Sequence, residues 1–594
     1  MSKIFNTVQI GQAASDYSKF NLSVDTLTTT DIGELSVVHC LECIIGDKIK
    51  VDYRLFGRTA TLVFPTYGDI YQRLVSVFVP YYQLADDFEA WVSGMRFYGG
   101  RQALPRYLTQ SLLDVIIYGN FYKPIVSSTM TSHTMVQLTS AEAAKLDKSN
   151  LPRGIFEHHG ENDTTTYFKL NTRGKSYYKL FRSLGYDFSR KLDFKRKVNN
   201  VVVPNVNSNT KLSIFPLLGY FKAFSDLLLP SARYQTSRVL KLLRGVKNAD
   251  SSFVEPTGLV KVDPVVDALN EVLVAYYDSD YFTSAWQSPN SPLSSMSSMV
   301  NTTFRDEDND VTMNTDSVSN RLTLGSTLSQ TQLNFLRGFD NFCRRNNLVG
   351  FREFNAVYAR YGIKPSEMKS NYCQVIDIDS MKLNVGDVTA TAQTDDTLLG
   401  SYAGKAFQAG EKSIELECKD FGIFLQIAYI GVKPIYFQGI RKHCLRVDPY
   451  DYYQPEFDGV GPAAISKREL NSQLPDEVFG FTERYNDYRF AQSNILGDFE
   501  LDELMWPWHT GRYFKPDETP IAQSDNVLTY RRDPFGNSEF DRIFAVENSS
   551  IANDADHFYQ TWTFNVTALR KMKNINQALN LGVGNIQLDR NGSV

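Results

Sequence analysis

The chain has 594 residues, of which 42% are hydrophobic and 22% are charged, a composition typical of a folded protein and not of a disordered one. Its formal net charge of -5 excludes a protein that coats nucleic acid over its whole surface, because such a surface is basic. Aromatic residues make up 13%, which favours β-rich structure and large contact surfaces.

No segment is expected to span a membrane. The longest apolar run, 421–432, is too short for a spanning helix and is interrupted by Gln426. The opening residues MSKIFNTVQIGQ lack the apolar core of a signal peptide. Apart from Cys40 and Cys43 the six cysteines are dispersed, so a reducing compartment is expected.

The first part of the chain predicts strands. Residues 1–33 are polar and rich in Thr and Ser, which indicates an extended N-terminal arm. The segment 35–45 is apolar and β-branched, Gly46-Asp47 is a turn signal, and 48–53 alternates between apolar and polar residues. Two further strands are predicted at 60–64 and at 74–82, the second ending or lying at an edge because of Pro80.

The middle of the chain has helical periodicity. Apolar residues recur at helical spacing in 214–229, and the same pattern returns in 333–343. A third helical stripe covers 354–361, and Gly362 follows it where a C-cap glycine is expected.

Strands are predicted again near the C-terminal side, at 412–418 and at 421–432, the latter apolar on both faces and therefore buried. The predicted fold class is mainly β, with long helix- and loop-containing insertions between the strands. Residues 287–332 are rich in Ser, Asn, Thr and Asp and carry an acidic cluster at 306–310. This segment predicts either a solvated connection or an exposed surface protrusion.

The segment 479–514 is dense in aromatic and arginine residues, which suit large contact surfaces. It predicts structural or interface anchors, in the core or between subunits, at Arg484, Tyr485, Tyr488, Arg489, Trp506, Trp508, Arg512, Tyr513 and Phe514.

Six blocks, in the same order, resemble the major capsid protein of microviruses, the small single-stranded-DNA phages, and its gokushovirus branch in particular. They are DIGELSVVHCLECIIGDKIKVDYR (31–54), LVSVFVPYYQLADDFEAWVSG (74–94), DYFTSAWQSP (280–289), PIYFQGI (434–440), YDYYQPEF (450–457), and RYNDYR with WHTGRYF (484–489 and 508–514). Residues 126–212 and 290–330 match nothing in that family's pattern, and Glu483 and Pro507 interrupt otherwise close blocks.

The resemblance implies an eight-stranded antiparallel jelly roll with large insertions, here one capsid domain over 34–594 in which 126–212 and 287–332 are variable. It implies self-assembly into a T=1 icosahedral shell around a circular single-stranded DNA genome, in a virion assembled in the host cytoplasm. Implied partners are further copies of the chain, a small basic DNA-binding protein, a pilot protein, an internal scaffolding protein and a host-cell receptor. No enzymatic activity, cofactor or membrane is implied.

The residues themselves give weak signals for other chemistry. Cys40 and Cys43 form a lone C-x-x-C in a predicted strand, where residues three apart point to opposite faces and do not meet one metal ion. Glu157, His158 and His159 precede a polar turn and are expected to be exposed. No catalytic or metal-binding residue is therefore predicted.

The segment 173–197 is the best nucleic-acid candidate, with nine basic residues against two acidic ones and aromatic residues between them. Basic side chains contact phosphates, and aromatic rings stack on unpaired bases. The candidate DNA-binding residues are Lys191, Lys195, Arg196, Lys197, Tyr177, Tyr178 and Phe194. A solvated basic face or a contact between subunits would also explain this composition.

Two alternatives remain open for the sequence. A secreted or surface β-sandwich that binds carbohydrate would explain the aromatic excess, but it predicts a secretion signal. A glycoside hydrolase would need two carboxylates paired in a cleft, which the sequence does not indicate. A shell subunit would form megadalton particles, whereas either alternative would remain a small oligomer.

Overall fold

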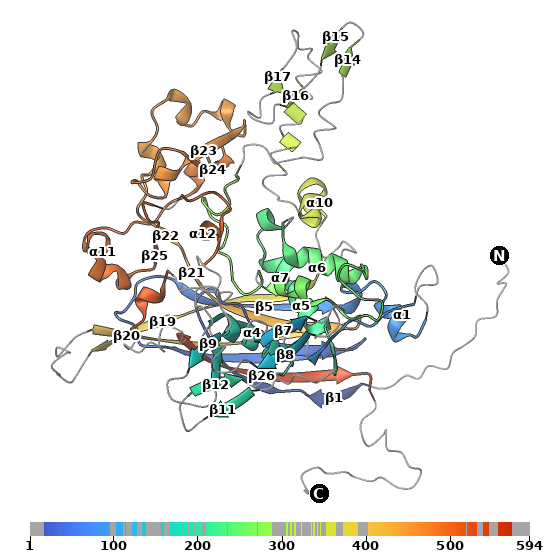
Figure 1. Cartoon of the computed structure of the whole chain (residues 1–594). Helices are drawn as coiled ribbons and strands as arrows, with labels where there is room; N and C mark the ends of the chain where they lie inside the picture. The colour runs from blue at the N-terminus through green and yellow to red at the C-terminus, as the bar shows by residue number, and fades with distance from the viewer. Residues whose placement is uncertain are drawn as a thin grey trace, which may run out of the picture.

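The computed structural model describes residues 17–95, 102–110, 172–187, 210–287, 352–363, 372–389, 402–530, 539–545 and 556–572, apart from positions 235, 270 and 518. It also describes isolated helical and strand residues between 113 and 202 and between 304 and 345. Two antiparallel sheets packed face to face form the centre of the molecule, and insertions rise from one side of them (Figure 1).

Sheet one has the order β1-β26-β4-β20-β19, with β2 also pairing with β26. Its strands are β1 (Ser18–Asn21), β2 (Val24–Thr30), β4 (Lys48–Thr59), β19 (Asn384–Thr389), β20 (Tyr402–Glu417) and β26 (Phe558–Arg570). Sheet two has the order β18-β5-β21-β3. Its strands are β3 (Ser36–Cys43), β5 (Ile70–Pro80), β18 (Gln374–Lys382) and β21 (Gly422–Val432). The chain is therefore mainly β with antiparallel sheets, as the sequence predicts.

The two sheets enclose one hydrophobic core. Strand β4 alternates strictly between buried and less buried residues, because one of its faces packs on sheet two. Its inward residues, such as Val51 and Tyr53, meet Phe424 of β21 and Trp562 of β26 in the same cluster. Apolar alternation in strands from both ends of the chain thus builds the sandwich.

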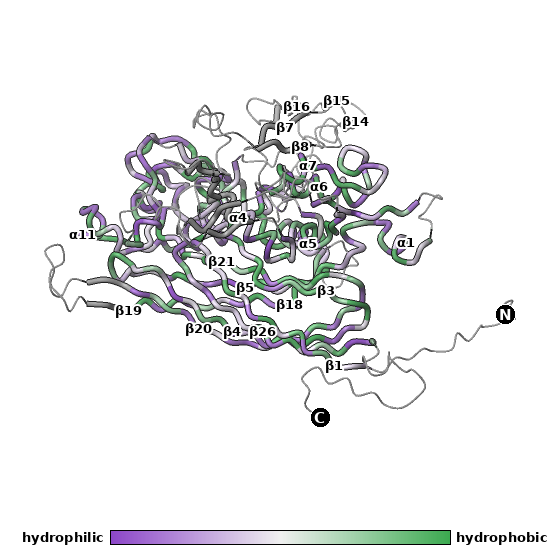
Figure 2. The backbone as a smooth tube through the Cα atoms, turned by 60° about the horizontal axis from the view of Figure 1, so that its bottom comes forward, coloured by the Kyte–Doolittle hydropathy of each residue, from purple (hydrophilic) through white to green (hydrophobic). Residues whose placement is uncertain are grey.

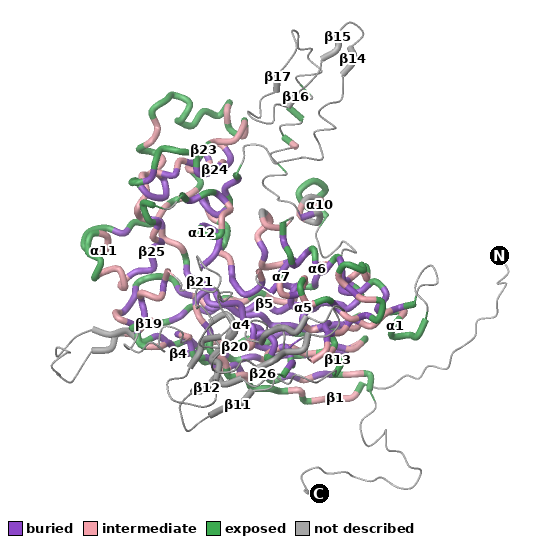
Figure 3. The backbone as a smooth tube through the Cα atoms, viewed as in Figure 1, coloured by how far each residue is buried: buried purple, intermediate pink, exposed green. Residues whose placement is uncertain are grey.

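The central strands of sheet two, β5 and β21, are buried on both faces, and β21 is buried along its whole length. On its far side it packs against helices, which share a second hydrophobic cluster with Ile423, Leu425 and Ile427. These helices are α4 (Thr172–Ser183), α5 (Phe215–Ala223), α6 (Arg238–Lys247) and α7 (Val262–Leu269), and a π-helical turn (Phe224–Leu228) continues α5. Figure 3 shows this buried layer between the sheets and the helices.

The insertions contain short paired strands. One four-stranded sheet has the order β11-β12-β10-β9, made of β9 (Phe156–His159), β10 (Tyr167–Leu170), β11 (Arg190–Asp193) and β12 (Val198–Val202). Two-stranded pairs are β6 (Tyr107–Thr109) with β13 (Lys211–Ser213), β7 (Tyr122–Val126) with β8 (His133–Gln137), β14 (Phe304–Asp306) with β15 (Asn309–Val311), and β16 (Asn314–Thr315) with β17 (Leu322–Thr323). Apart from these four strands, the predicted protrusion 287–332 lies almost entirely outside the described residues.

The segment 434–530 forms a separate lobe with its own hydrophobic cluster, which includes Phe282, Phe479 and Phe514. Its elements are β22 (Ile435–Tyr436), β23 (Pro462–Ser466), β24 (Val478–Glu483), α11 (Asp498–Leu501), a 3-10 helix (Glu503–Trp508), β25 (Gly511–Arg512) and α12 (Asp525–Leu528). In Figure 1 this lobe stands on the same side of the sandwich as helices α5 to α7 and strands β14 to β17.

Several predicted elements are confirmed, including the strands at 35–45, 48–53, 412–418 and 421–432. Helix α10 (Glu353–Tyr361) ends at Gly362, which has a φ of 71°, as its predicted C-cap role requires. The predicted strand at 60–64 is wrong. Those residues make only the isolated bridge from Leu62 to Phe544, because their backbone bonds to the loop around Ile543 instead of to a strand. The predicted helix at 333–343 lies largely outside the described residues.

The N-terminal part of the chain contributes to sheet one. Within the predicted arm 1–33, β1 and β2 pair with β26, and residues 1–16 lie outside the described residues. Gly33 follows these strands with a φ of 73°, and a Cβ there would lie 2.4 Å from Cβ of Tyr530. This turn therefore requires glycine in order to carry the chain from sheet one to sheet two.

Candidate interface segment and nucleic-acid groove

Arg512 is a buried anchor of the C-terminal lobe. Its side chain is 2% exposed, and its guanidinium donates to Glu539 Oε1 at 3.2 Å and to the backbone oxygens of Val527 at 2.9 Å and Asn526 at 2.8 Å. The guanidinium carbon also lies 4.2 Å from the ring centroid of Tyr277, which belongs to the core beneath sheet two. Arg512 thus joins the lobe to the sandwich within one subunit.

The other residues of the predicted anchor segment differ in burial. Tyr485 and Phe514 are buried. The rings of Trp506 and Trp508 are half-buried: Trp508 stacks on Phe64, and Trp506 packs against Tyr513 at a tilt of 43°. Tyr513 and Arg484 are also of intermediate burial. Tyr488 and Arg489 are exposed. The structure therefore separates internal anchors from residues at the surface, a distinction that the sequence did not indicate.

The same segment carries exposed leucines that the sequence analysis did not single out. Leu496 is 70% exposed, Leu501 82% and Leu504 77%. We call these three side chains the leucine ridge. In the sequence they lie close to the exposed acids Asp498 and Glu503. The signal in the sequence that could have indicated a contact surface is therefore the presence of apolar residues within a polar run.

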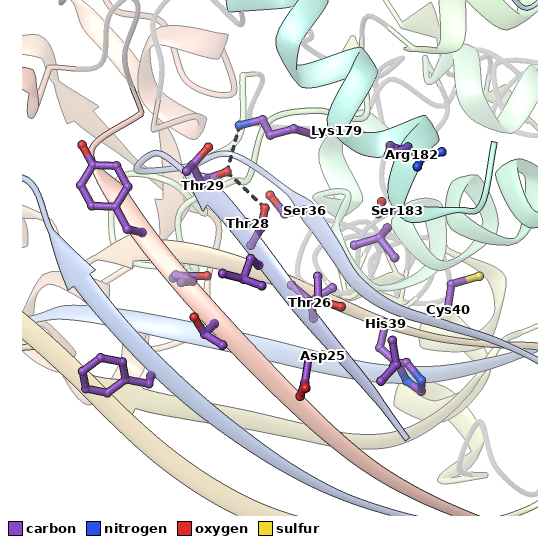
Figure 4. Close-up of a pocket in the computed structure, with 18 of the residues that line it drawn as sticks. Asp25, Thr26, Thr28, Thr29, Ser36, His39, Cys40, Lys179, Arg182 and Ser183 are labelled. Carbon is purple, nitrogen blue, oxygen red and sulfur yellow. Dashed lines mark hydrogen bonds between the residues drawn. The ribbon is translucent and has the colours of Figure 1, made fainter. Parts of the chain in front are cut away.

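A groove of about 850 Å³ runs around the edge strand β2, between sheet one, β3 and helix α4 (Figure 4). Tyr178, Lys179 and Arg182 of α4 line it on one side, and Phe56, Arg58 and Tyr559 of sheet one also border it. Part of the basic-aromatic segment predicted for DNA therefore lies next to aromatic side chains of sheet one.

The basic side chains that α4 brings to the groove have acidic partners. Lys179 Nζ lies 2.5 Å from Glu34 Oε2 and 3.3 Å from Asp556 Oδ2. Arg182 Nη1 lies 2.9 Å from Asp187 Oδ1. These ion pairs lower the positive charge that α4 can offer to a phosphate.

One predicted stacking residue is corrected by the structure. Tyr177 is 2% exposed and packs in the hydrophobic core, because α4 turns this ring toward sheet two. Its ring is therefore not accessible to a base, whereas Tyr178 on the next position is partly exposed. Lys191 lies in β11, and Phe194, Lys195, Arg196 and Lys197 lie outside the described residues.

Two titratable groups that line the groove, His39 and Cys40, are held in their neutral forms. Burial lowers the pKa of His39 to about 4, although a hydrogen bond with Gln426 opposes the effect. Burial, followed by the charge of Glu42, raises the pKa of Cys40 to about 12. Cys40 and Cys43 lie in different hydrophobic clusters on the two sides of sheet two, which confirms that they face apart.

Asp31, Asp541 and His557 form a small cluster whose possible metal-ligand atoms all lie within 4.8 Å of one another. His557 Nδ1 lies 3.1 Å from Asp31 Oδ1, and its ring stacks on Phe544 at 4.1 Å. Burial alone would lower the pKa of His557, but the hydrogen bond with Asp31 and the surrounding carboxylates raise it overall. This geometry is explained by an imidazolium–carboxylate ion pair. Glu157, His158 and His159 lie in β9, whose side chains are outside the described residues.

Comparison with known proteins agrees with this architecture. The chain matches the family described as capsid protein (F protein) over residues 8–96 and 342–579, more than half of its length. It is 37% identical over 104 residues to capsid protein VP1 of Bdellovibrio phage phiMH2K, covering 15% of this chain and 20% of that protein. It is 22% identical over 264 residues to capsid protein VP1 of Chlamydia phage 1, covering 41% of each.

The matched regions thus span less than half of the length of either relative. Among the described residues, no helix combines the length and the apolar character needed to cross a membrane. The family implies a structural role in a phage virion, and the resemblance to microvirus capsid proteins is confirmed. The chain belongs to the phage capsid protein (F protein) family.

Proposed function

We propose that this chain is the major capsid protein of a microvirus-like phage and assembles into a T=1 icosahedral shell around circular single-stranded DNA. The observation that carries the proposal is the leucine ridge within a chain of the capsid family. Three leucines that are each at least 70% exposed would be costly in an isolated subunit. In an assembled shell, a neighbouring copy of the chain would cover these leucines.

A second exposed apolar region supports repeated contacts between copies. Val447, Tyr450, Tyr452, Tyr453 and Val460 lie on the C-terminal lobe and are all exposed. A closed shell needs heterologous contacts, in which two different patches on each subunit meet. Two separate apolar regions on one lobe agree with that requirement.

For the fold, we propose an eight-stranded jelly roll made of β18, β5, β21 and β3 in sheet two and β2, β26, β4 and β20 in sheet one. The domain proposal is an N-terminal arm over 1–33, whose strand β2 is added to sheet one, and one capsid domain over 34–594. In that domain, 126–212 and 287–332 are the variable insertions, and 287–332 is a surface protrusion.

The proposed partners are those of a virion: the DNA genome, a small basic DNA-binding protein, a pilot protein, an internal scaffolding protein and a host-cell receptor. The net charge of -5 supports a separate basic partner that neutralises much of the DNA. Candidate DNA contacts remain Tyr178, Lys191, Phe194, Lys195, Arg196 and Lys197. Of the proposed interface residues, Tyr488 and Arg489 are the exposed ones.

Sedimentation and electron microscopy of the purified full chain test this function. We expect closed particles of megadalton mass, far above the 67.5 kDa of one chain. A monomer or small oligomer under all conditions that permit assembly would contradict the proposal. That result would instead favour a carbohydrate-binding β-sandwich or a glycoside hydrolase. Glycan binding without hydrolysis would then indicate the first, and glycan hydrolysis the second.

A further inference from the structure

Sheet one has one covered and one uncovered face among the described residues. In β4, Ile49, Val51 and Leu55 point into the sandwich, whereas Phe56 and Arg58 point away from it. Figure 2 shows helices α4 to α7 on the opposite side of the sandwich, beyond sheet two. The uncovered face of sheet one is therefore a broad surface directed away from the helices.

Strand register gathers three aromatic rings around one arginine on this face. Phe407 of β20 lies directly opposite Arg58 of β4, and Arg58 lies directly opposite Tyr559 of β26. Phe56 precedes Arg58 by two residues on the same face, and its ring centroid is 5.2 Å from the Arg58 guanidinium carbon. We call Phe56, Arg58, Phe407 and Tyr559 the sheet-face cluster. Its rings are 49%, 52% and 49% exposed for Phe56, Phe407 and Tyr559 respectively.

The cations of β4 and β20 on this face differ in whether they have acidic partners. Toward the other end of β4 the cations have acidic partners: Arg54 with Glu411 at 3.1 Å, Lys50 with Asp52 at 3.8 Å, and Lys48 with Glu417 at 4.0 Å. Among the described residues, Arg58 has no carboxylate within ion-pair distance, and neither has the exposed Lys405, two residues before Phe407. The cluster thus combines uncompensated cations with accessible rings.

The cluster also opens into the groove around β2. Phe56, Arg58 and Tyr559 line that groove together with Tyr178 of α4. Leu27 of β2, which is 80% exposed, also lines the groove. A flexible ligand on the face could therefore continue around the edge toward α4.

We propose that the sheet-face cluster binds single-stranded DNA, with unpaired bases stacked on Phe56, Phe407 and Tyr559 and a phosphate held by Arg58. The proposal rests on the proposed function, because the ligand is the genome that the shell would enclose. Aromatic platforms with nearby cations are the usual way in which proteins bind unpaired strands without sequence preference. Phe407 and Tyr559 are two strand spacings apart, about 10 Å, so each can hold a separate base.

Other occupants fit the observations less well. A basic peptide would meet the uncompensated Arg58 and Lys405 and be repelled. Duplex DNA keeps its bases stacked on one another, so it would use the cations and leave the three rings exposed. A second copy of the chain would bury the rings but would need an acidic patch opposite Arg58.

The test uses the full chain and a fluorescein-labelled oligodeoxythymidine of about 16 nucleotides, with anisotropy measured over a series of salt concentrations. The variants are Phe56→Ala, Phe407→Ala, Tyr559→Ala and Arg58→Gln. Matched controls are Asn565→Ala and Thr567→Ala, on the same face and strand as Tyr559, and Lys50→Gln for the charge. Particle assembly is recorded for every variant.

We expect each ring variant to weaken binding about 5- to 150-fold and the controls to bind like the parent chain. Arg58→Gln is expected to lower the slope of log affinity against log salt by about 0.7. Photo-crosslinking of bromodeoxyuridine-substituted DNA to the unmodified chain should label the peptides that contain Phe56, Phe407 or Tyr559.

Parent-like binding by all four variants, or crosslinks confined to other peptides, would overturn the proposal. Ring variants that lose assembly but keep DNA binding would also overturn it, since the face would then be an interface between copies. Failure of the shell proposal is recognised by a different measurement. In that case the unmodified chain would form no particles, whether or not it binds the oligonucleotide.

Discussion

The guanidinium of Arg512 and the carboxylate of Glu539 meet at 3.2 Å with both side chains almost completely buried. Burial alone would lower the pKa of Arg512, but Tyr277, Glu539 and Tyr436 raise it above its ordinary value, so the arginine stays charged. An arginine held in this way fixes the C-terminal lobe against the sandwich. The lobe carries the leucine ridge, so this pair positions the proposed contact surface.

Replacing Arg512 by Ala is expected to destabilise the subunit by about 3–5 kcal/mol, because Glu539 would remain buried without its charged partner. Urea unfolding of the unassembled chain measures the effect. The control is Arg489→Ala, whose side chain is 60% exposed and whose ion pair with Asp458 is long at 3.4 Å. That control should change stability by no more than about 0.5 kcal/mol. Equal effects of the two substitutions would contradict the anchor role of Arg512.

Replacing Leu501 and Leu504 together by Ser should reduce the yield of particles without lowering the unfolding midpoint of the subunit. Both side chains are more than three-quarters exposed, so the folded subunit loses little buried area when they are removed. Sucrose-gradient sedimentation gives the particle yield. Leu240→Ser, at a buried position of α6, is a contrasting control: it should lower the unfolding midpoint of the subunit, which the double variant should not do. Normal particle yield from the double variant would show that the leucine ridge is not a contact between copies.

Acid should destabilise the subunit through His39. Its pKa is about 4 in the fold, against 6.5 for an exposed histidine, because the ring is buried against Phe564 at 4.6 Å. The neutral ring therefore contributes stability above pH 6.5 that is lost as the pH falls to about 4. The difference corresponds to about 3 kcal/mol. Urea unfolding between these pH values should show a smaller loss for His39→Gln than for the parent chain, and identical losses would refute this explanation.

His557 should have the opposite pH dependence. Asp31, Asp541 and Asp556 outweigh the effect of burial and raise its pKa above 6.5. A raised pKa gives stability that is complete below pH 6.5 and disappears as the pH rises through the pKa of the folded state. His557→Gln should remove this alkaline loss. NMR titration of the imidazole checks the direction, and a pKa below 6.5 would contradict the ion pair with Asp31.

Much of the sandwich could be predicted from local sequence. Strands β3, β4 and β21 have strong apolar or alternating patterns. Such patterns are sufficient to predict a strand when one or both of its faces are buried. Strand β26 was missed, although Phe558, Trp562 and Phe564 alternate with polar residues there.

The site was harder to predict, because it depends on contacts across the chain. Nothing local shows that Arg512 is buried by Tyr277 and Glu539, or that Tyr177 faces the core while Tyr178 faces the groove. The sheet-face cluster is formed from residues 56–58, 407 and 559, which only strand register brings together. Basic composition alone favoured 173–197, where ion pairs with Glu34, Asp556 and Asp187 reduce the available charge.

Electron cryo-microscopy of particles formed by the full chain is the most direct test of the central claim, that this subunit builds a closed shell around single-stranded DNA. We predict a T=1 icosahedral particle in which copies contact one another through the leucine ridge and sheet one faces the interior. Density for nucleic acid is expected against Phe56, Arg58, Phe407 and Tyr559. Absence of closed particles, or a shell with sheet one on its outer surface, would contradict this account.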